Sequence, residues 1–176
     1  MNVLVGTAIM VNKMNLDLVK WNKIYENNKR LDLIFYEKYP NEDIFKKNSI
    51  EFLVELGEFL NETKIFKYWS IKKPEKEKVL EEYADNITIC LTFFRELNMD
   101  LEKSYPHLET KDTIEIANYL YEKVSQVMHH SNIDLLSDIF GNLLYLGNLL
   151  GILEEEIINA VKEKHKIIEM RLNSNY

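Results

Sequence analysis

Apolar residues recur at helical spacing along most of the chain. In the first pattern, from residue 16 to about residue 36, they gather on one face, and the Tyr39-Pro40-Asn41 stretch ends it. No alternation typical of β-strands persists in any segment, and no internal repeat interrupts the series. The pattern predicts an all-α, single-domain bundle of about six helices, over residues 16–36, 49–63, 74–97, 110–130, 131–150 and 154–172.

Composition supports one globular domain and excludes some functions. The 176 residues are 46% hydrophobic and 29% charged, with five glycines and three prolines, so few turns are required. A net charge of -7 disfavours a nucleic-acid partner, because such proteins usually carry a basic surface that neutralises phosphates. Cys90 is the single cysteine and falls in an apolar run, so we expect a buried thiol in a reducing cytoplasm.

The first residues have a different character from the rest. Val3 to Val11 form an apolar segment, but it is much shorter than the roughly 20 residues that span a bilayer. A signal-peptide core fits less well, because the small-residue cleavage site is missing behind it. We therefore predict an N-terminal arm over residues 1–15, or an extension upstream of a start at Met14, and a cytoplasmic domain over residues 16–176 without membrane partners.

An acidic stripe on the predicted helix 49–63 is the strongest chemical signal. Glu51, Glu55, Glu58 and Glu62 fall within a strip about 60° wide, and the other sides of this helix are apolar. An ordinary surface helix is polar over half its circumference or more, so these acids are expected to face something inside the protein. Their mutual repulsion, which grows on desolvation, would be offset by a bound cation.

The next helix supplies a matching pair, Glu82 and Asp85, followed at once by an apolar run that places Asp85 at the edge of the core. Two such pairs on antiparallel helices would bring four carboxylates together as hard oxygen ligands, which suit Mg²⁺ or Mn²⁺ better than zinc. The alternative is two solvated acidic faces, since E-x-x-E spacing is common.

Two stretches resemble a known family. ELGEFLNETKIFKYWS, residues 55–70, and LEEYADNITICLTF, residues 80–93, are similar to the dimeric, all-α dUTP diphosphatases. These belong to the wider all-α (MazG-like) NTP pyrophosphatases, which carry an E-x-x-E helix and then an E-x-x-D helix. The end of the chain, residues 146–176, also resembles the family, whose last helix contacts phosphates through a lysine, an asparagine and an arginine. The resemblance implies a homodimer with a four-helix metal-binding core.

The resemblance also implies the site residues. The metal, Mg²⁺ with Mn²⁺ as a substitute, would be held by Glu55, Glu58, Glu82 and Asp85, with Glu55 as the catalytic carboxylate that orients or deprotonates water. The substrate would contact Asn28, Lys67, Trp69, Lys164 and Arg171. Trp69 could instead anchor the aromatic link of residues 64–74, which we expect to form a pocket wall or a buried plug.

Some positions depart from the family pattern. Ile168 stands where the asparagine between Lys164 and Arg171 is expected, Asn28 replaces a glutamine, and Asn86-Ile87-Thr88 replaces a small-residue and histidine pattern. His165 has no evident partner in the sequence.

The function implied by the resemblance is hydrolysis of dUTP, with dUDP as a further candidate substrate, to dUMP. The departures leave two alternatives open. One is a related pyrophosphatase for another nucleotide, such as dCTP or a noncanonical NTP. The other is a regulatory homologue that has lost turnover.

Overall fold

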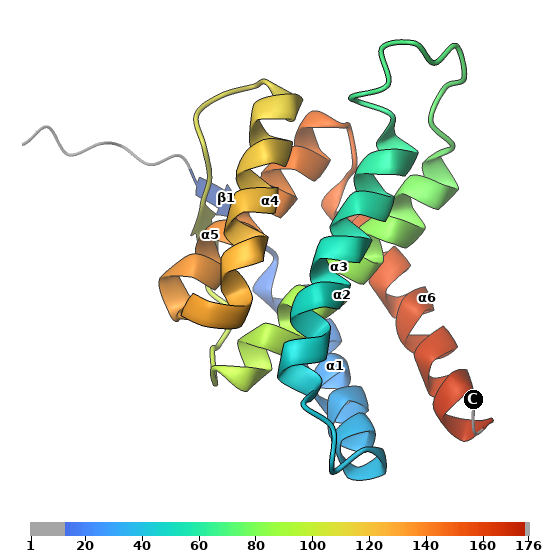
Figure 1. Ribbon diagram of the computed structural model, residues 1–176, viewed down its shortest axis with the longest axis vertical. Helices are drawn as coiled ribbons and strands as arrows, with labels where there is room; N and C mark the ends of the chain where they lie inside the picture. The colour runs from blue at the N-terminus through green and yellow to red at the C-terminus, as the bar shows by residue number, and fades with distance from the viewer. Residues whose placement is uncertain (1–12, 175–176) are drawn as a thin grey trace, which may run out of the picture.

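The computed structural model describes residues 13–174, so most of the predicted arm and the last two residues lie outside the described part. It contains six helices and one small sheet (Figure 1). The helices are α1 (Leu18–Lys38), α2 (Ile44–Thr63), α3 (Lys76–Glu96), α4 (Thr113–His130), α5 (Ile133–Leu149) and α6 (Glu154–Asn173). The predicted all-α class and single domain are confirmed.

Two short strands are an addition that the sequence pattern did not predict. β1 (Lys13–Asn15) pairs antiparallel with β2 (Ser104–Pro106), with Met14 opposite Tyr105. Strands of three residues are too short to produce recognisable alternation, and these two lie far apart in sequence. The two strands do not change the all-α class. Residues 13–15 thereby pack against the helical domain.

Side-chain caps determine where several helices begin. Asp43 accepts a hydrogen bond from the backbone N–H of Lys46, which lets α2 begin five residues earlier than predicted. Asp112 accepts from the backbone N–H groups of Ile114 and Glu115, as expected of a cap for α4. Lys64, in the left-handed conformation with φ 58°, ends α2. The observed starts therefore follow local polar groups that apolar periodicity does not report.

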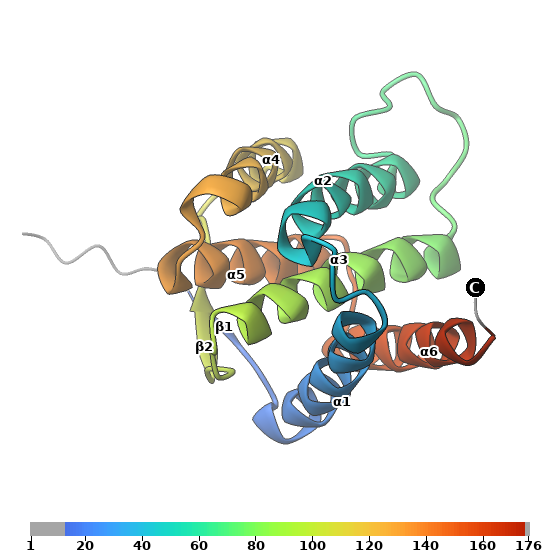
Figure 2. The same ribbon diagram turned by 60° about the horizontal axis from the view of Figure 1, so that its bottom comes forward.

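The central helix of the fold is α3, which packs against α1, α2, α5 and α6 (Figure 2). From Tyr83 to Phe94 all but one of its residues are buried, and this run includes Cys90, whose predicted burial is confirmed. At one end of this helix, Phe94 contacts the rings of Tyr105 in β2 and Phe140 in α5. These contacts pack the small sheet and α5 against the core. The site described below lies on the side of α3 that faces α1, α2 and α6.

The link between α2 and α3 is largely exposed, which corrects the expectation of a buried plug. Tyr68 is 95% exposed, Trp69 63% and Ile71 99%. The link extends beyond the ends of both helices (Figure 1). Trp69 contacts the rings of Phe66 and Tyr68, and Phe66 also lines a small cavity between α2 and α4. Trp69 therefore does not anchor the link into the interior.

None of the helices in the described range is by itself long and apolar enough to cross a membrane. The α5–α6 pair meets the length and composition criteria only when both helices are combined across a bend of 115°.

Candidate metal and nucleotide site

Three of the four predicted metal ligands come together where α2 meets α3. Glu55 comes from α2, and Glu82 and Asp85 come from successive turns of α3. Each can offer a carboxylate oxygen such that these oxygens all lie within 4.8 Å of one another. Asp85 is buried, and the two glutamates are half-buried. The antiparallel arrangement of the two acidic pairs thus produces a cluster rather than two separate solvated faces.

A buried asparagine holds the two helices in register at this level. The Asn86 side-chain amide donates to the backbone carbonyls of Glu55 and Glu82, both at 2.8 Å. Its own Oδ1 is buried and has no hydrogen-bond partner within residues 13–174. Because the amide bonds to the backbone of two cluster residues on different helices, it sets the spacing of α2 and α3 where their carboxylates meet. In the sequence, Asn86 stands out only as a departure from the family pattern.

Electrostatics at the cluster are unfavourable for three negative charges. Burial, together with the Asp85 and Glu58 carboxylates, raises the pKa of Glu55 from 4.5 to about 7. Burial also raises the pKa of Glu82 and that of Asp85. In addition, Glu55 Oε2 is buried and accepts no hydrogen bond within the described range. Such a cluster is stabilised by protons or by a cation.

Lys164 on α6 already supplies one cation. Its Nζ lies 2.5 Å from Oδ1 and 2.6 Å from Oδ2 of Asp85, and both side chains are mostly shielded from water. This ion pair counteracts the effect of burial on the pKa of Asp85, to which Arg171 also contributes. The C-terminal helix is thereby attached to the acidic cluster through one of its predicted phosphate-binding residues.

Glu58 is the fourth predicted ligand, and it lies at the margin. Its side chain is exposed, and it is not part of the close group of three carboxylates. It is near enough to raise the pKa of both Glu55 and Glu82. One helical turn separates it from Glu55, which moves it towards the exposed end of the helix pair.

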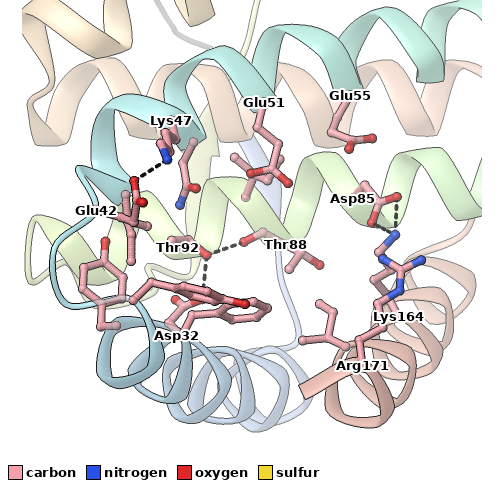
Figure 3. Close-up of a pocket in the computed structure, with 17 residues that line it drawn as sticks. Asp32, Glu42, Lys47, Glu51, Glu55, Asp85, Thr88, Thr92, Lys164 and Arg171 are labelled. Carbon is pink, nitrogen blue, oxygen red and sulfur yellow. Dashed lines mark hydrogen bonds and ion pairs between the residues drawn. The ribbon is translucent and has the colours of Figure 1, made fainter. Parts of the chain in front are cut away.

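A cavity of about 530 Å³ extends from the cluster, and Figure 3 shows the side chains that line it. This volume lies in the range of small-molecule sites, roughly 300–1,000 Å³. Its walls come from four helices, α1, α2, α3 and α6. One end is charged and is lined by Glu55, Asp85, Lys164, Arg171 and the nearby Ile168.

The other end of the cavity combines aromatic and polar groups, among them Phe35, Tyr36, Asp32 and Thr92. Thr92 Oγ1 donates to Asp32 Oδ1 at 3.0 Å, and Arg95 Nε donates to Asp32 Oδ2 at 3.2 Å. Burial raises the pKa of Asp32 to about 6, although Arg95 and Thr92 oppose the shift. This end of the cavity was not predicted from the sequence. A signal was present, because Asn28 with Asp32, and Thr88 with Thr92, are polar pairs at i,i+4 on buried helix faces.

The remaining predicted substrate residues lie outside the cavity lining. Asn28 is 1% exposed and is separated from the cavity by Asp32 and Thr92, to which its amide donates. Lys67 donates to Asn61 at 2.5 Å in the exposed link, and Trp69 lies in the same link. For these three residues, direct contact with a nucleotide stays a prediction.

Comparison with known families decides the assignment. A family model described as dUTPase matches residues 20–176. The chain belongs to this dUTPase family. No curated protein gave a significant match. The match covers every predicted site residue and all of the six helices except the first two residues of α1, so the family resemblance of the sequence is confirmed. Members of this family are hydrolases that act on dUTP.

The residues of this dUTPase-family chain fit a divalent metal ion. Three carboxylates offer hard oxygen ligands at one point, and one of their oxygens is buried and has no hydrogen-bond partner among residues 13–174. Lys164 accounts for one of the negative charges, so the cluster keeps a negative excess when its carboxylates are ionised. Glu55, Glu82 and Asp85 would hold the ion, with Glu58 at its margin.

We predict that the metal-free protein loses stability as the pH rises and that Glu55 is a cause. A carboxylate whose folded pKa is raised stabilises the fold fully below its unfolded pKa of 4.5, and this contribution is lost as the pH rises through about 7. In EDTA at about pH 8, Glu55→Gln should therefore melt at a higher temperature than the wild type, and the advantage should shrink at about pH 5. Thermal melting by circular dichroism measures both.

Millimolar Mg²⁺ should raise the melting temperature of the wild type and have less effect on Glu55→Gln, since binding stabilises only a folded site. Glu62→Gln, on the same helix but outside the close cluster, is the matched control and should behave as the wild type. Equal melting of wild type and Glu55→Gln at both pH values would contradict the buried, repulsive cluster.

Proposed function

We propose that this chain hydrolyses dUTP to dUMP and pyrophosphate in a Mg²⁺-dependent reaction, with Mn²⁺ as a substitute and dUDP as a second substrate. The observation that carries the proposal is the division of the cavity into two ends. Glu55, Asp85, Lys164 and Arg171 line one end (Figure 3). The other end has aromatic rings, Asp32, Thr92 and the Glu42–Lys47 ion pair. A nucleotide has the same division, since its phosphates need charge compensation and its base and sugar need stacking surfaces and polar partners.

The charged end supports phosphoryl chemistry. Lys164 and Arg171 stand beside the carboxylates, so the phosphates would meet both a metal site and fixed side-chain cations. When bound, Mg²⁺ would neutralise phosphate charge and lower the pKa of a water molecule. The Lys164 ammonium would then donate hydrogen bonds to both Asp85 and a phosphate oxygen. Chemistry of this kind depends mainly on positioning and charge.

Glu55 is the proposed acceptor of the water proton. Its Oε2 has no partner within residues 13–174, so this oxygen is open to a water molecule beside the metal site. Attack of water on the α-phosphorus would break the bond to the oxygen that bridges the α- and β-phosphates. The proton would pass to Glu55, and dUMP and pyrophosphate would leave.

The nucleoside end supports recognition of a pyrimidine. Asp32 and Thr92 can accept hydrogen bonds from N–H or O–H groups of the base or sugar, and Phe35 and Tyr36 offer ring surfaces. These groups can bind a pyrimidine base, and the choice between dUTP and dCTP depends on how the acceptors are oriented.

A nucleotide panel tests the activity. With Mg²⁺ present, dUTP should give the highest kcat/KM among dUTP, dUDP, dCTP and dTTP, with dUMP and pyrophosphate as the products. Reaction in H₂¹⁸O should place the label in dUMP, because the water attacks the α-phosphorus. A preference for dCTP or a noncanonical nucleotide would move the assignment to a related pyrophosphatase, and absence of turnover on the whole panel would favour the regulatory alternative.

We predict that Ile168→Asn lowers the KM for dUTP. Ile168 is half-buried and lines the charged end of the cavity near Lys164 and Arg171, and it cannot form hydrogen bonds. One added neutral hydrogen bond contributes roughly 0.5 to 1.5 kcal/mol, so KM should fall about three- to twelve-fold while kcat changes little. Steady-state kinetics measure the effect. A lower melting temperature with an unchanged or higher KM would mean that Ile168 only packs the helix, and the phosphate roles of Lys164 and Arg171 would fall with it.

We also propose a homodimer, supported by apolar side chains that the single chain leaves in water. Tyr68 and Ile71 are almost fully exposed in the link, and Ile50 and Val54 are exposed one turn apart on α2. The proposed contacts of Lys67 and Trp69 with a nucleotide would likewise depend on what covers this link.

Light scattering at micromolar concentration should give about twice the 21.0 kDa of one chain. The double variant Tyr68→Ser, Ile71→Ser should shift the mass towards one chain and keep the helical circular dichroism of the wild type, because both residues are exposed on the single chain. A wild-type mass near 21.0 kDa would remove the proposal.

A further inference from the structure

A buried histidine on α6 lies between two asparagines of α1. His165 is 3% exposed, although its sequence gave no sign of a partner. Its Nε2 lies 2.9 Å from Asn28 Oδ1, and its Nδ1 lies 3.0 Å from Asn27 Nδ2. Both ring nitrogens are thus satisfied by side-chain amides of one neighbouring helix.

The surroundings of the two amides fix the tautomer of the imidazole. Asn28 Nδ2 faces acceptors on Asp32, Thr92 and Thr88 at 3.2, 3.1 and 3.4 Å, so the Asn28 oxygen must point to His165. Asn27 Oδ1 accepts from Nε and Nη2 of Arg30, so the Asn27 nitrogen must point to His165. His165 therefore donates from Nε2 and accepts at Nδ1, which describes one neutral tautomer.

The charge state agrees with this geometry. Burial and the nearby Arg30 lower the pKa of His165 to about 4. A protonated ring would also place a second N–H against the amide donor of Asn27. The imidazole is therefore a neutral polar link near neutral pH and does not act as an acid or a base there.

The link continues to the cavity. His165 holds the Asn28 oxygen, and the Asn28 nitrogen holds Asp32 and Thr92, both of which line the nucleoside end. The two cavity residues also bond to each other, so the network joins α6, α1 and α3. Lys164, next to His165 in sequence, reaches the acidic cluster, which means that α6 supports both ends of the cavity.

We propose that His165 is a positioning residue for nucleoside binding: through Asn28, its Nε2–H orients Asp32 and Thr92 towards the base and sugar of the substrate. The assignment rests on the proposed function, because it takes the Asp32 end of the cavity as the nucleoside end. It adds a role for a residue that touches neither the substrate nor the metal site. Without the Nε2–H donor, the Asn28 side chain can rotate, and its hydrogen bonds to Asp32 and Thr92 are then weakened.

Binding of dUMP tests the proposal, because dUMP fills the nucleoside end and undergoes no cleavage. Calorimetry should give weaker dUMP binding for His165→Leu, by about three- to twelve-fold, as expected for one lost neutral hydrogen bond. The KM for dUTP should rise by a similar factor with kcat little changed. His165→Gln, which can offer an N–H near the Nε2 position, should recover most of the binding. Lys166→Gln, an exposed neighbour on α6, is the matched control and should bind dUMP like the wild type.

Two results would overturn the proposal. One is wild-type dUMP affinity in His165→Leu, whatever its melting temperature, because the histidine would then only fill space. The other is a ¹⁵N spectrum in which His165 carries its proton on Nδ1 near neutral pH, because the link to Asn28 would then lack its donor. A failure of His165→Gln to bind better than His165→Leu would also contradict a role for the N–H.

A failure of the proposed function would look different, since the wild type itself would neither bind dUMP nor hydrolyse dUTP. The positioning of Asp32 is still decided in that case by an NMR titration of its carboxyl group. His165→Leu should raise the pKa of Asp32, because the hydrogen bond from Asn28 is weakened, and Lys166→Gln should leave it unchanged. An Asp32 titration that is the same in all three proteins would reject the link.

Discussion

Three carboxylates lie together where α2 meets α3, at a point partly withdrawn from water, and the rest of the site depends on how the fold tolerates them. Their mutual repulsion is offset by Lys164, by raised pKa values and, in our account, by a divalent metal ion. The repulsion does not separate the helices, because Asn86 bonds to the backbone of both and apolar side chains pack on either side of it. In our account, the cluster lowers the stability of the metal-free fold and favours the binding of a cation.

The α6 helix connects this constraint to substrate recognition. Lys164 forms an ion pair with Asp85. The next residue, His165, hydrogen-bonds to Asn28, which lies behind the Asp32 end of the cavity. A helix that is held at both places fixes the distance between the phosphate end and the base end. In our proposal, a change in how α6 packs would therefore alter metal binding and nucleoside binding together, although α6 supplies none of the metal ligands.

The sequence predicted the parts of the site that follow from a helical repeat. The width of the acidic stripe placed Glu55 on the inner face of α2, and the apolar run after Asp85 placed that residue at the edge of the core. Periodicity does not give the position along the helix at which two helices cross. For this reason it could not separate Glu55, inside the cluster, from Glu58, one turn further and exposed.

Other features depended on contacts between distant segments. The partners of His165 lie on α1, far away in sequence, and the pairing of β1 with β2 is too short to leave a pattern. Asn28 was predicted to touch the substrate from its place in the family pattern, yet its burial depends on the packing of α1 against α3 and α6. The link that carries Trp69 is the opposite case. Its aromatic composition suggested burial, but Trp69 is exposed in the single chain.

The central claim is that the α2–α3 carboxylates bind a divalent metal ion, and a calorimetric titration of Mn²⁺ tests it most directly. Glu82 belongs to the cluster, whereas its sequence neighbour Glu81 is exposed and lies outside it, so the two substitutions remove the same charge at adjacent positions. We expect Glu82→Gln to weaken Mn²⁺ binding by at least about ten-fold, equal to roughly 1.4 kcal/mol, and Glu81→Gln to bind like the wild type. Equal affinities in all three proteins, or equal losses in both variants, would contradict the account.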